Sequence, residues 1–139
     1  TRNQDGSLTF TVQALANGYG LDWGIAGTPG VRTDTTATNG ALALDQGVTS
    51  TAFGLQAFLQ VFAFTGTSVT VAVQDSADNV TYANVTGGVF AAASAIGVQR
   101  IETGRTQTVR RYLRVATTGT FTNAQFAVSI HVNPIATVF

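Results

Sequence analysis

The chain has 139 residues, a formal net charge of zero and only 10% charged side chains. A chain of this length can bury about 70% of its surface as a single domain, and its neutral balance lacks the positive charge that binding to nucleic acid or to an anionic membrane requires. With no cysteine, the sequence excludes disulfide scaffolds, thiolate metal sites and cysteine nucleophiles. No apolar run approaches the roughly 18 residues of a membrane span.

The first forty residues contain one predicted strand and much irregular chain. Residues 7–14 alternate apolar and polar side chains, which is typical of a half-buried strand. Residues 17–30 are rich in Gly, residues 32–39 are polar and Thr-rich, and residues 41–44 predict a short strand. We divide the chain into an N-terminal strand with an extended arm or loop, residues 1–40, and a β-sandwich domain, residues 41–139. The arm is a candidate for wrapping around a neighbouring molecule, and the start at Thr1 without an initiator Met suggests a processed or partial chain.

Residues 55–75 are the predicted centre of the fold and read as two strands joined by a tight Thr65-Gly66-Thr67 turn. The second strand alternates cleanly, with Val69, Val71 and Val73 facing a core. The first strand is apolar on both faces and must be covered on both, within the domain or by a neighbouring subunit. Its predicted faces are Leu55, Ala57, Leu59, Val61 and Ala63 on one side, and Phe58, Phe62 and Phe64 on the other.

Further strands are predicted over residues 80–85, 96–102, 109–116 and 124–132, with a short strand or loop over residues 89–95. A second Thr-Gly-Thr, at residues 118–120, is interpreted as a reused turn type, with an internal duplication as the alternative. No helical period of ten residues occurs. Short alternating runs separated by turns predict an all-β fold, an antiparallel β-sandwich or jelly roll.

The residues that catalysis needs are scarce. One histidine, one glutamate and six aspartates are present, and no Gly-x-Ser-x-Gly motif supports a nucleophilic serine. Asp75, Asp78 and Asn79 surround a turn, where turn capping is the favoured interpretation over a Ca²⁺ site. We therefore predict no enzyme activity, no metal and no cofactor.

Arginine and tyrosine supply the candidate contact residues. All seven basic residues are arginine, whose planar guanidinium suits fixed contacts, and a low surface charge favours association. Alternation places two sets of side chains on opposite faces of the strand over residues 109–116: Val109, Arg111, Leu113 and Val115 on one face, and Arg110, Tyr112 and Arg114 on the other. The candidate interface residues are Arg110, Tyr112 and Arg114, together with Arg32. An exposed solvated face is the alternative.

Residues 54–86, with Val98-Gln99-Arg100-Ile101 and Arg110-Arg111-Tyr112-Leu113-Arg114-Val115, resemble the β-sandwich domain in structural proteins of tailed bacteriophages, particularly those of actinobacteria. The resemblance implies a non-enzymatic virion protein that is made in the host cytoplasm and self-assembles as a tail-tube or capsid-decoration subunit. Its implied partners are copies of itself and the major capsid or tail proteins. The neutral charge balance and the lack of a long apolar run predict contact with neither nucleic acid nor a membrane.

A second resemblance supports an alternative function. Ser76-Ala77-Asp78-Asn79-Val80-Thr81-Tyr82 and Arg111-Tyr112-Leu113-Arg114-Val115 are similar to segments of the discoidin and galactose-binding jelly rolls, with Asn79 where that family has glycine and Tyr82 where it has tryptophan. The matched positions are mainly structural in that family, so sugar binding does not follow from them; a carbohydrate-binding module used in adhesion to a host surface is the alternative function. Trp23 and Tyr82 are its candidate sugar platforms, with burial of Trp23 under its loop as the alternative.

Overall fold

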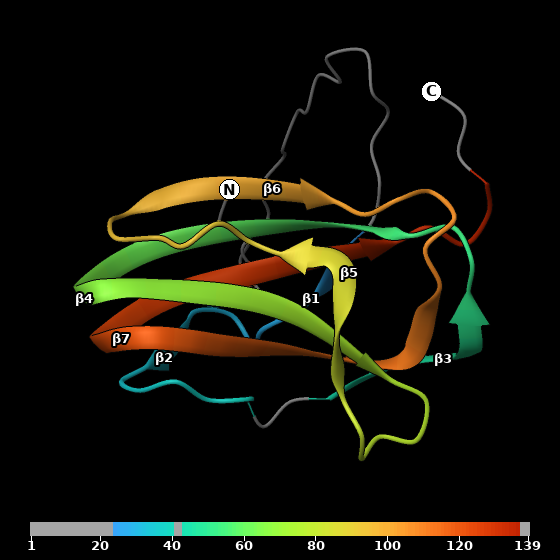
Figure 1. The fold of residues 1–139 in the computed structure, drawn as a ribbon, viewed down its shortest axis with the longest axis horizontal. Coiled ribbons are helices and arrows are strands. Elements are labelled where there is room, and N and C mark those ends of the chain that lie inside the picture. The colour runs from blue at the N-terminus through green and yellow to red at the C-terminus, as the bar shows by residue number, and fades with distance from the viewer. Residues whose placement is uncertain (1–23, 41–42, 137–139) are drawn as a thin grey trace, which may run out of the picture.

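The computed structural model describes residues 24–40 and 43–136, whose path is drawn in Figure 1. These residues form strands, turns and loops without a helix, which confirms the all-β prediction. Accordingly, no membrane-spanning helix occurs in this part of the chain. The strands are, in chain order, β1 (Ile25–Ala26), β2 (Arg32–Asp34), β3 (Leu44–Thr51), β4 (Leu55–Ser76), β5 (Ala83–Val89), β6 (Gly97–Glu102) and β7 (Val109–Val132).

Two long strands, β4 and β7, form the centre of the fold. They pair antiparallel over their whole lengths, from Leu55 opposite Val132 to Ser76 opposite Tyr112. On the outer edge of β7, β3 pairs with its first half, and β2 and β1 pair with its second half. On the outer edge of β4, β6 pairs with its first half and β5 with its second. All seven strands of the described residues therefore belong to one antiparallel sheet.

The Thr65-Gly66-Thr67 segment does not end a strand, so the predicted hairpin turn is wrong. β4 continues through it, and the second Thr-Gly-Thr lies nearly opposite in β7, where Phe121 pairs with Gly66 and Gly119 pairs with Val69. Figure 1 shows both strands bending at the same end of the molecule, so the two halves of the ribbon run over one another. The strands predicted separately over residues 109–116 and 124–132 are likewise the two halves of β7.

Glycine is required in both strands at this bend. Gly66 and Gly119 have φ angles of 150° and 117°, a region that side chains other than glycine rarely adopt. A Cβ atom on Gly66 would lie 2.4 Å from Cα of Phe121, and one on Gly119 would lie 2.4 Å from the backbone oxygen of Ser68. The repeated Thr-Gly-Thr therefore has a structural explanation, since a two-stranded ribbon can bend only where both strands bend.

The two halves of the ribbon share one hydrophobic core. The inward positions of β4 are buried as predicted, both before the bend and after it, except Ala63, which was predicted on the inward face and is only partly buried. The alternate positions of β7 fill the same core. Its largest fully buried side chains are Phe90, Phe126, Leu55, Leu59, Leu113, Ile130, Val61, Val69, Val71, Val73, Val109 and Val115.

A β-bulge divides the phenylalanines of β4. The pairing with β7 shifts by one residue between Val61 and Ala63, which leaves Phe62 as the extra residue. A one-residue shift reverses the order of inward and outward side chains beyond it, so Phe64 turns and packs against the core. The prediction that Phe64 shares a face with Phe58 and Phe62 is therefore wrong. Phe58 and Phe62 each remain 45% exposed.

The remaining expectations differ from the structure mainly at the strand ends. β6 and the loop over residues 89–95 lie where predicted, whereas β5 begins three residues later than residue 80 because a turn occupies the intervening chain. Within the predicted arm, β2 pairs with β7 and belongs to the sheet. The predicted strand over residues 7–14 lies outside the described residues.

We expect Gly66→Ala to lower the free energy of unfolding by about 2 kcal/mol or more, because the new methyl group meets backbone at a φ angle unsuited to alanine. Urea denaturation followed by tryptophan fluorescence or circular dichroism measures the change. Gly97→Ala is the control, since no atom lies within 4 Å of its added Cβ, and its expected effect is within about 0.5 kcal/mol. Equal losses for the two variants would contradict the role of the bend.

Candidate functional site

Four of the five acidic side chains of the described residues form ion pairs with arginine, and the fifth, Asp78, accepts hydrogen bonds within a turn. Asp34 pairs with Arg32, and Asp45 pairs with Arg111. Asp75 and Glu102 likewise face arginines of β7 and β6. Among the described residues, no three His, Asp or Glu side chains come together as a metal site. Two surfaces of the described residues are the candidate sites.

The first candidate surface is built on the first half of β7. Val109, Leu113 and Val115 are buried, as the predicted alternation requires, whereas the Arg111 side chain, predicted on the same face, is 40% exposed. Arg110 projects from the strand with its side chain 51% exposed, and its Nη1 lies 4.0 Å from Oδ1 of Asp75. Because that separation is long and the guanidinium is solvated, the pair leaves Arg110 available to a partner.

Arg114 and Tyr82, which were predicted for two different functions, form one contact. The guanidinium of Arg114 lies 4.0 Å from the centroid of the Tyr82 ring, a favourable cation–π distance. Nε of Arg114 also donates a 2.7 Å hydrogen bond to Oε1 of Gln74. The Tyr82 hydroxyl donates to Oδ1 of Asn79 at 2.5 Å, and partial burial raises the pKa of Tyr82. Both side chains are therefore held in position by β4, β7 and the turn before β5.

A second arginine–tyrosine contact lies beside the first. Arg111 lies over the ring of Tyr112 at 5.2 Å, and its Nε and Nη2 donate hydrogen bonds of 2.8 and 2.9 Å to Asp45 of β3. These bonds, with one from the Gly47 backbone N–H, lower the pKa of Asp45 to about 2. We call Tyr82, Arg110, Arg111, Tyr112 and Arg114 the arginine–tyrosine cluster.

Hydrogen bonds within the turn that precedes Tyr82 fix the position of that residue. Oδ1 of Asp78 accepts hydrogen bonds from the Ser76 hydroxyl and from the backbone N–H groups of Val80 and Thr81. The bonds from the Thr81 and Val80 backbones, followed by that from Ser76, hold the pKa of Asp78 well below its usual range. Asn79 has a φ angle of 61°, a conformation that glycine and asparagine tolerate best. The predicted turn-capping role of Asp78 is thus observed.

The second candidate surface is the outer face of the first half of β4, away from the core. We call Phe58, Gln60, Phe62, Val98, Ala127 and Ser129 the Phe58 face; they alternate with buried neighbours or occupy the matching positions of β6 and β7. An open groove of about 520 Å³ runs along it. The groove is lined by Gly24, Ala26, Thr28, Gly30, Phe58, Leu59, Gln60, Val98, Gln99, Ala127, Val128 and Ser129.

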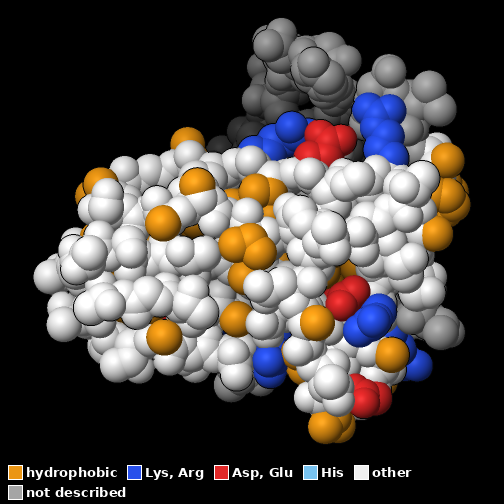
Figure 2. Space-filling view, viewed as in Figure 1, with side chains coloured by type: hydrophobic (Ala, Val, Ile, Leu, Met, Phe, Trp, Pro, Cys, Tyr) orange, Lys and Arg blue, Asp and Glu red, His pale blue; other side chains and the backbone are white. Residues whose placement is uncertain are grey.

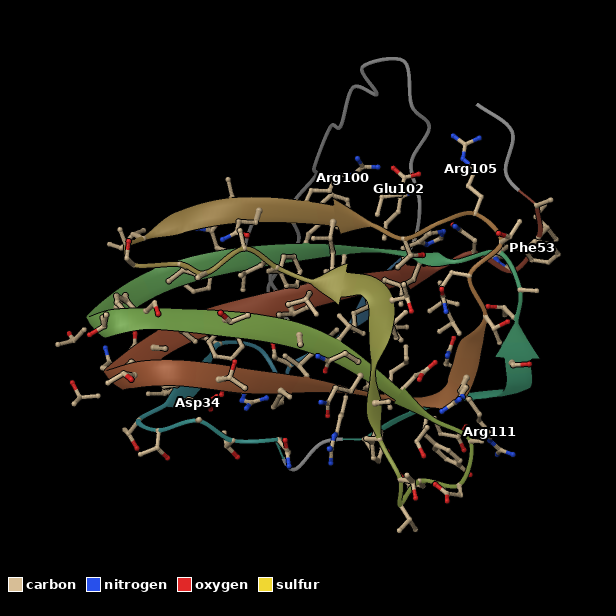
Figure 3. The ribbon with its side chains drawn as sticks, in the orientation of Figure 1. Asp34, Phe53, Arg100, Glu102, Arg105 and Arg111 are labelled. Atoms are coloured by element: carbon tan, nitrogen blue, oxygen red, sulfur yellow. The ribbon has the colours of Figure 1, made fainter. Side chains whose placement is uncertain are left out.

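Charge on the Phe58 face is confined to one end. Arg100 lies over the Phe58 ring at 5.9 Å and donates 2.9 Å hydrogen bonds to Gln56 and Glu102. Figure 3 shows Arg100 and Glu102 side by side at β6, with Arg111 on the opposite side of the molecule. In the view of Figure 2, the end of the molecule at which the ribbon bends shows no charged side chain.

Arg32, a predicted interface residue, uses its donors within the chain. Its side chain is 13% exposed and binds Asp34 through Nε and Nη2, at 2.8 and 2.7 Å. Nη1 donates a 2.6 Å hydrogen bond to the carbonyl oxygen of Val115, and the guanidinium lies 5.3 Å from the Phe126 ring centroid. Arg32 therefore ties β2 to β7. Trp23 lies outside the described residues.

Comparisons of the sequence with the models of known protein families and with curated proteins find no match. The case for a function therefore depends on the two surfaces themselves.

We expect Arg32→Ala to lower the free energy of unfolding by about 3 kcal/mol, because it leaves the buried Asp34 carboxylate with Thr117 as its remaining hydrogen-bond donor. Urea denaturation measures the loss. Arg110→Ala is the matched control, and we expect it to change stability by less than about 0.5 kcal/mol because that side chain is solvated. A small effect at Arg32 would mean that the Asp34 carboxylate is reached by water.

The carboxyl group of Asp45 should titrate near pH 2 rather than at its usual value of 3.8. A lowered pKa in the folded state means that the stabilisation is complete above pH 3.8 and is lost as the pH falls toward 2. Carbon-detected NMR titration measures the pKa directly. In Arg111→Gln, the pKa of Asp45 should rise toward 3.8 while that of Asp78 stays unchanged; an unchanged Asp45 would show that Arg111 is not its partner in solution.

Proposed function

We propose that this chain is a non-enzymatic structural subunit that assembles with copies of itself. The observation that carries the proposal is the exposed Phe58 face, with Phe58 and Phe62 each 45% and Val98 72% exposed on a chain of zero net charge. Exposed apolar patches on soluble proteins mark interaction sites. A surface with few charges also offers little repulsion to a second copy.

The strand order supports a jelly-roll assignment within the all-β fold. Each half of the bent ribbon can be treated as part of its own layer. In one layer the strand order is β1 and β2, then the second half of β7, then the first half of β4, and then β6. In the other layer the strand order is β3, then the first half of β7, then the second half of β4, and then β5. A jelly roll of eight strands in two sheets has this interleaved order, and viral capsid domains commonly adopt it. Lectin domains adopt it too, so the fold leaves the choice of function to the surfaces.

We place the subunit in the particle of a tailed bacteriophage, as a tail-tube or capsid-decoration protein made in the host cytoplasm. The resemblance of residues 54–86, 98–101 and 110–115 to such proteins supports this placement. Its partners would be copies of itself and the major capsid or tail proteins. Arg110 is the best placed contact residue of the arginine–tyrosine cluster because its guanidinium is solvated, whereas Tyr82 and Arg114 already bind one another.

The contact between Arg114 and Tyr82 argues against the alternative function, a carbohydrate-binding module. A sugar stacks on an open aromatic face, and the guanidinium of Arg114 covers one face of the Tyr82 ring at 4.0 Å. Tyr82 therefore offers at most its other face. No observation in the described residues favours sugar binding over assembly.

We expect the purified full chain to assemble as its concentration rises from micromolar to millimolar, giving a multiple of the 14.4 kDa chain mass in light scattering. Electron microscopy should then show rings, tubes or particles decorated by the protein. Arg110→Ala combined with Arg114→Ala should weaken assembly, because both guanidinium groups lie on the cluster. Arg105→Ala, on another side of the molecule, is the matched control.

A chain that stays monomeric throughout this range, without binding phage particles, would overturn the proposal. A specific signal on a glycan array would replace it with the carbohydrate-binding alternative. Unchanged assembly in the double arginine variant would remove the cluster from the interface while leaving assembly intact.

A further inference from the structure

We propose that the Phe58 face is a two-fold interface between copies of this chain, in which Phe62 of each copy inserts into the groove of the other. The inference deepens the proposed function and rests on it, since it names the surface through which assembly begins. The occupant of this face is a second copy of the chain.

The protruding half of the interface comes from the bulge in β4. Phe62 is the extra residue of that bulge and has no partner of its own in β7. A bulge bends its strand and re-aims the side chain at that position. Phe62 is apolar and 45% exposed, and the described residues leave it uncovered, so it forms a knob on the outer surface of the sheet.

The receiving half is the groove beside Phe58. Its lining includes several small residues, among them Ala127 and Ser129 of β7 and Ala26 of β1, where larger side chains would fill the space. The residue before β1 is packed closely against β7, as a Cβ atom on Gly24 would lie 2.7 Å from Oγ of Ser129. The volume of about 520 Å³ exceeds that of a phenyl ring, and the lining offers both apolar atoms and the amide of Gln60.

Knob and groove lie on the same face, which is what a two-fold interface requires. Phe58 borders the groove and Phe62 follows four residues later, about 14 Å along the strand at 3.4 Å per residue. A two-fold axis between them brings the Phe62 knob of each copy to the groove of the other, so the patch is self-complementary. A chemically different partner would need to supply both a matching knob and a matching hollow.

The charges on the face are compatible with self-association. Arg100 and Glu102 stand next to each other at one end and are paired at 2.9 Å. Their opposite charges cancel locally, so a second copy meets no net repulsion and can exchange partners with the pair. His131 of β7 lies at this same end, opposite Gln56, and the six residues of the Phe58 face carry no ionisable side chain.

The area of the face sets the strength of the contact. Four strands spaced about 4.8 Å apart, over seven residues from Gln56 to Phe62, cover about 19 Å by 24 Å, or about 450 Å² per copy. The total of about 900 Å² is below the roughly 1,200 Å² of a stable protein–protein interface. The pairwise contact is therefore weak, and it becomes strong only when several contacts act together in an assembly.

Cross-linking tests the geometry, because the chain contains no cysteine. Phe62→Cys is mixed with Ser129→Cys under mild oxidation, and we expect a mixed disulfide dimer in large excess over either homodimer. Val80→Cys mixed with Ser129→Cys is the matched control, since Val80 is 80% exposed in a different part of the molecule. Predominant homodimers of Phe62→Cys would place Phe62 on the axis rather than in the groove and would overturn the inference.

Assembly of unmodified surfaces provides the second measurement. Phe62→Asp should raise the concentration needed for assembly by about tenfold or more, because it places a charge in an apolar groove. Val80→Asp, an equivalent substitution elsewhere, should leave it unchanged. Urea denaturation of both variants identifies any loss of assembly that follows from unfolding.

The two proposals fail in different ways. Normal assembly of Phe62→Asp, together with absence of the mixed disulfide, overturns the Phe58 face as the interface and leaves self-assembly standing. A wild-type chain that is monomeric at every concentration overturns both. A monomer whose Phe62→Cys thiol resists labelling shows that the chain covers its own face, and that result also overturns the inference.

Discussion

The rest of this structure depends on the antiparallel pairing of β4 with β7. Every other strand of the described residues pairs with one of these two, and the core is filled by their inward side chains. A ribbon this long cannot enclose a core while straight, so its usefulness depends on the bend at Gly66 and Gly119. The two glycines matter because each adopts a backbone conformation that other residues rarely reach, close to backbone atoms of the opposite strand.

Much of the fold could be predicted from the local sequence pattern, and the predictions that were wrong depended on pairing between distant residues. Val69, Val71 and Val73 alternate with polar neighbours, so their burial follows from the period of a strand. The sequence Thr65-Gly66-Thr67 is compatible with a hairpin turn or with a bend in a continuous strand, and only the pairing with β7 decides between them. The bulge at Phe62 is equally invisible locally, because an extra residue is defined by what lies opposite. Phe64 was assigned to the wrong face for this reason.

For the candidate surfaces too, local features could be predicted from the sequence and contacts between distant residues could not. The phenylalanine face was predictable as an apolar face needing cover, and the exposed fractions of Phe58 and Phe62 now show that the described residues do not cover it. The contact between Tyr82 and Arg114 joins residues whose patterns suggested separate functions, since their approach depends on how β5 and β7 flank β4. Arg32 reaches Val115 across 83 positions of sequence. No local pattern contains that contact, and it makes Arg32 part of the fold.

The length of the central ribbon also orders the events of folding. Between Ser76 and Tyr112 the chain closes a loop of 36 residues, and between Leu55 and Val132 it closes one of 77, as the differences in residue number show. Loop closure therefore costs least entropy at the Ser76 end, which favours pairing that proceeds from there through the glycine bend. During synthesis, β4 emerges well before β7, so the apolar side chains of β4 remain unpaired with β7 during that time. The interval between those two strands is when this chain is most exposed to mispairing.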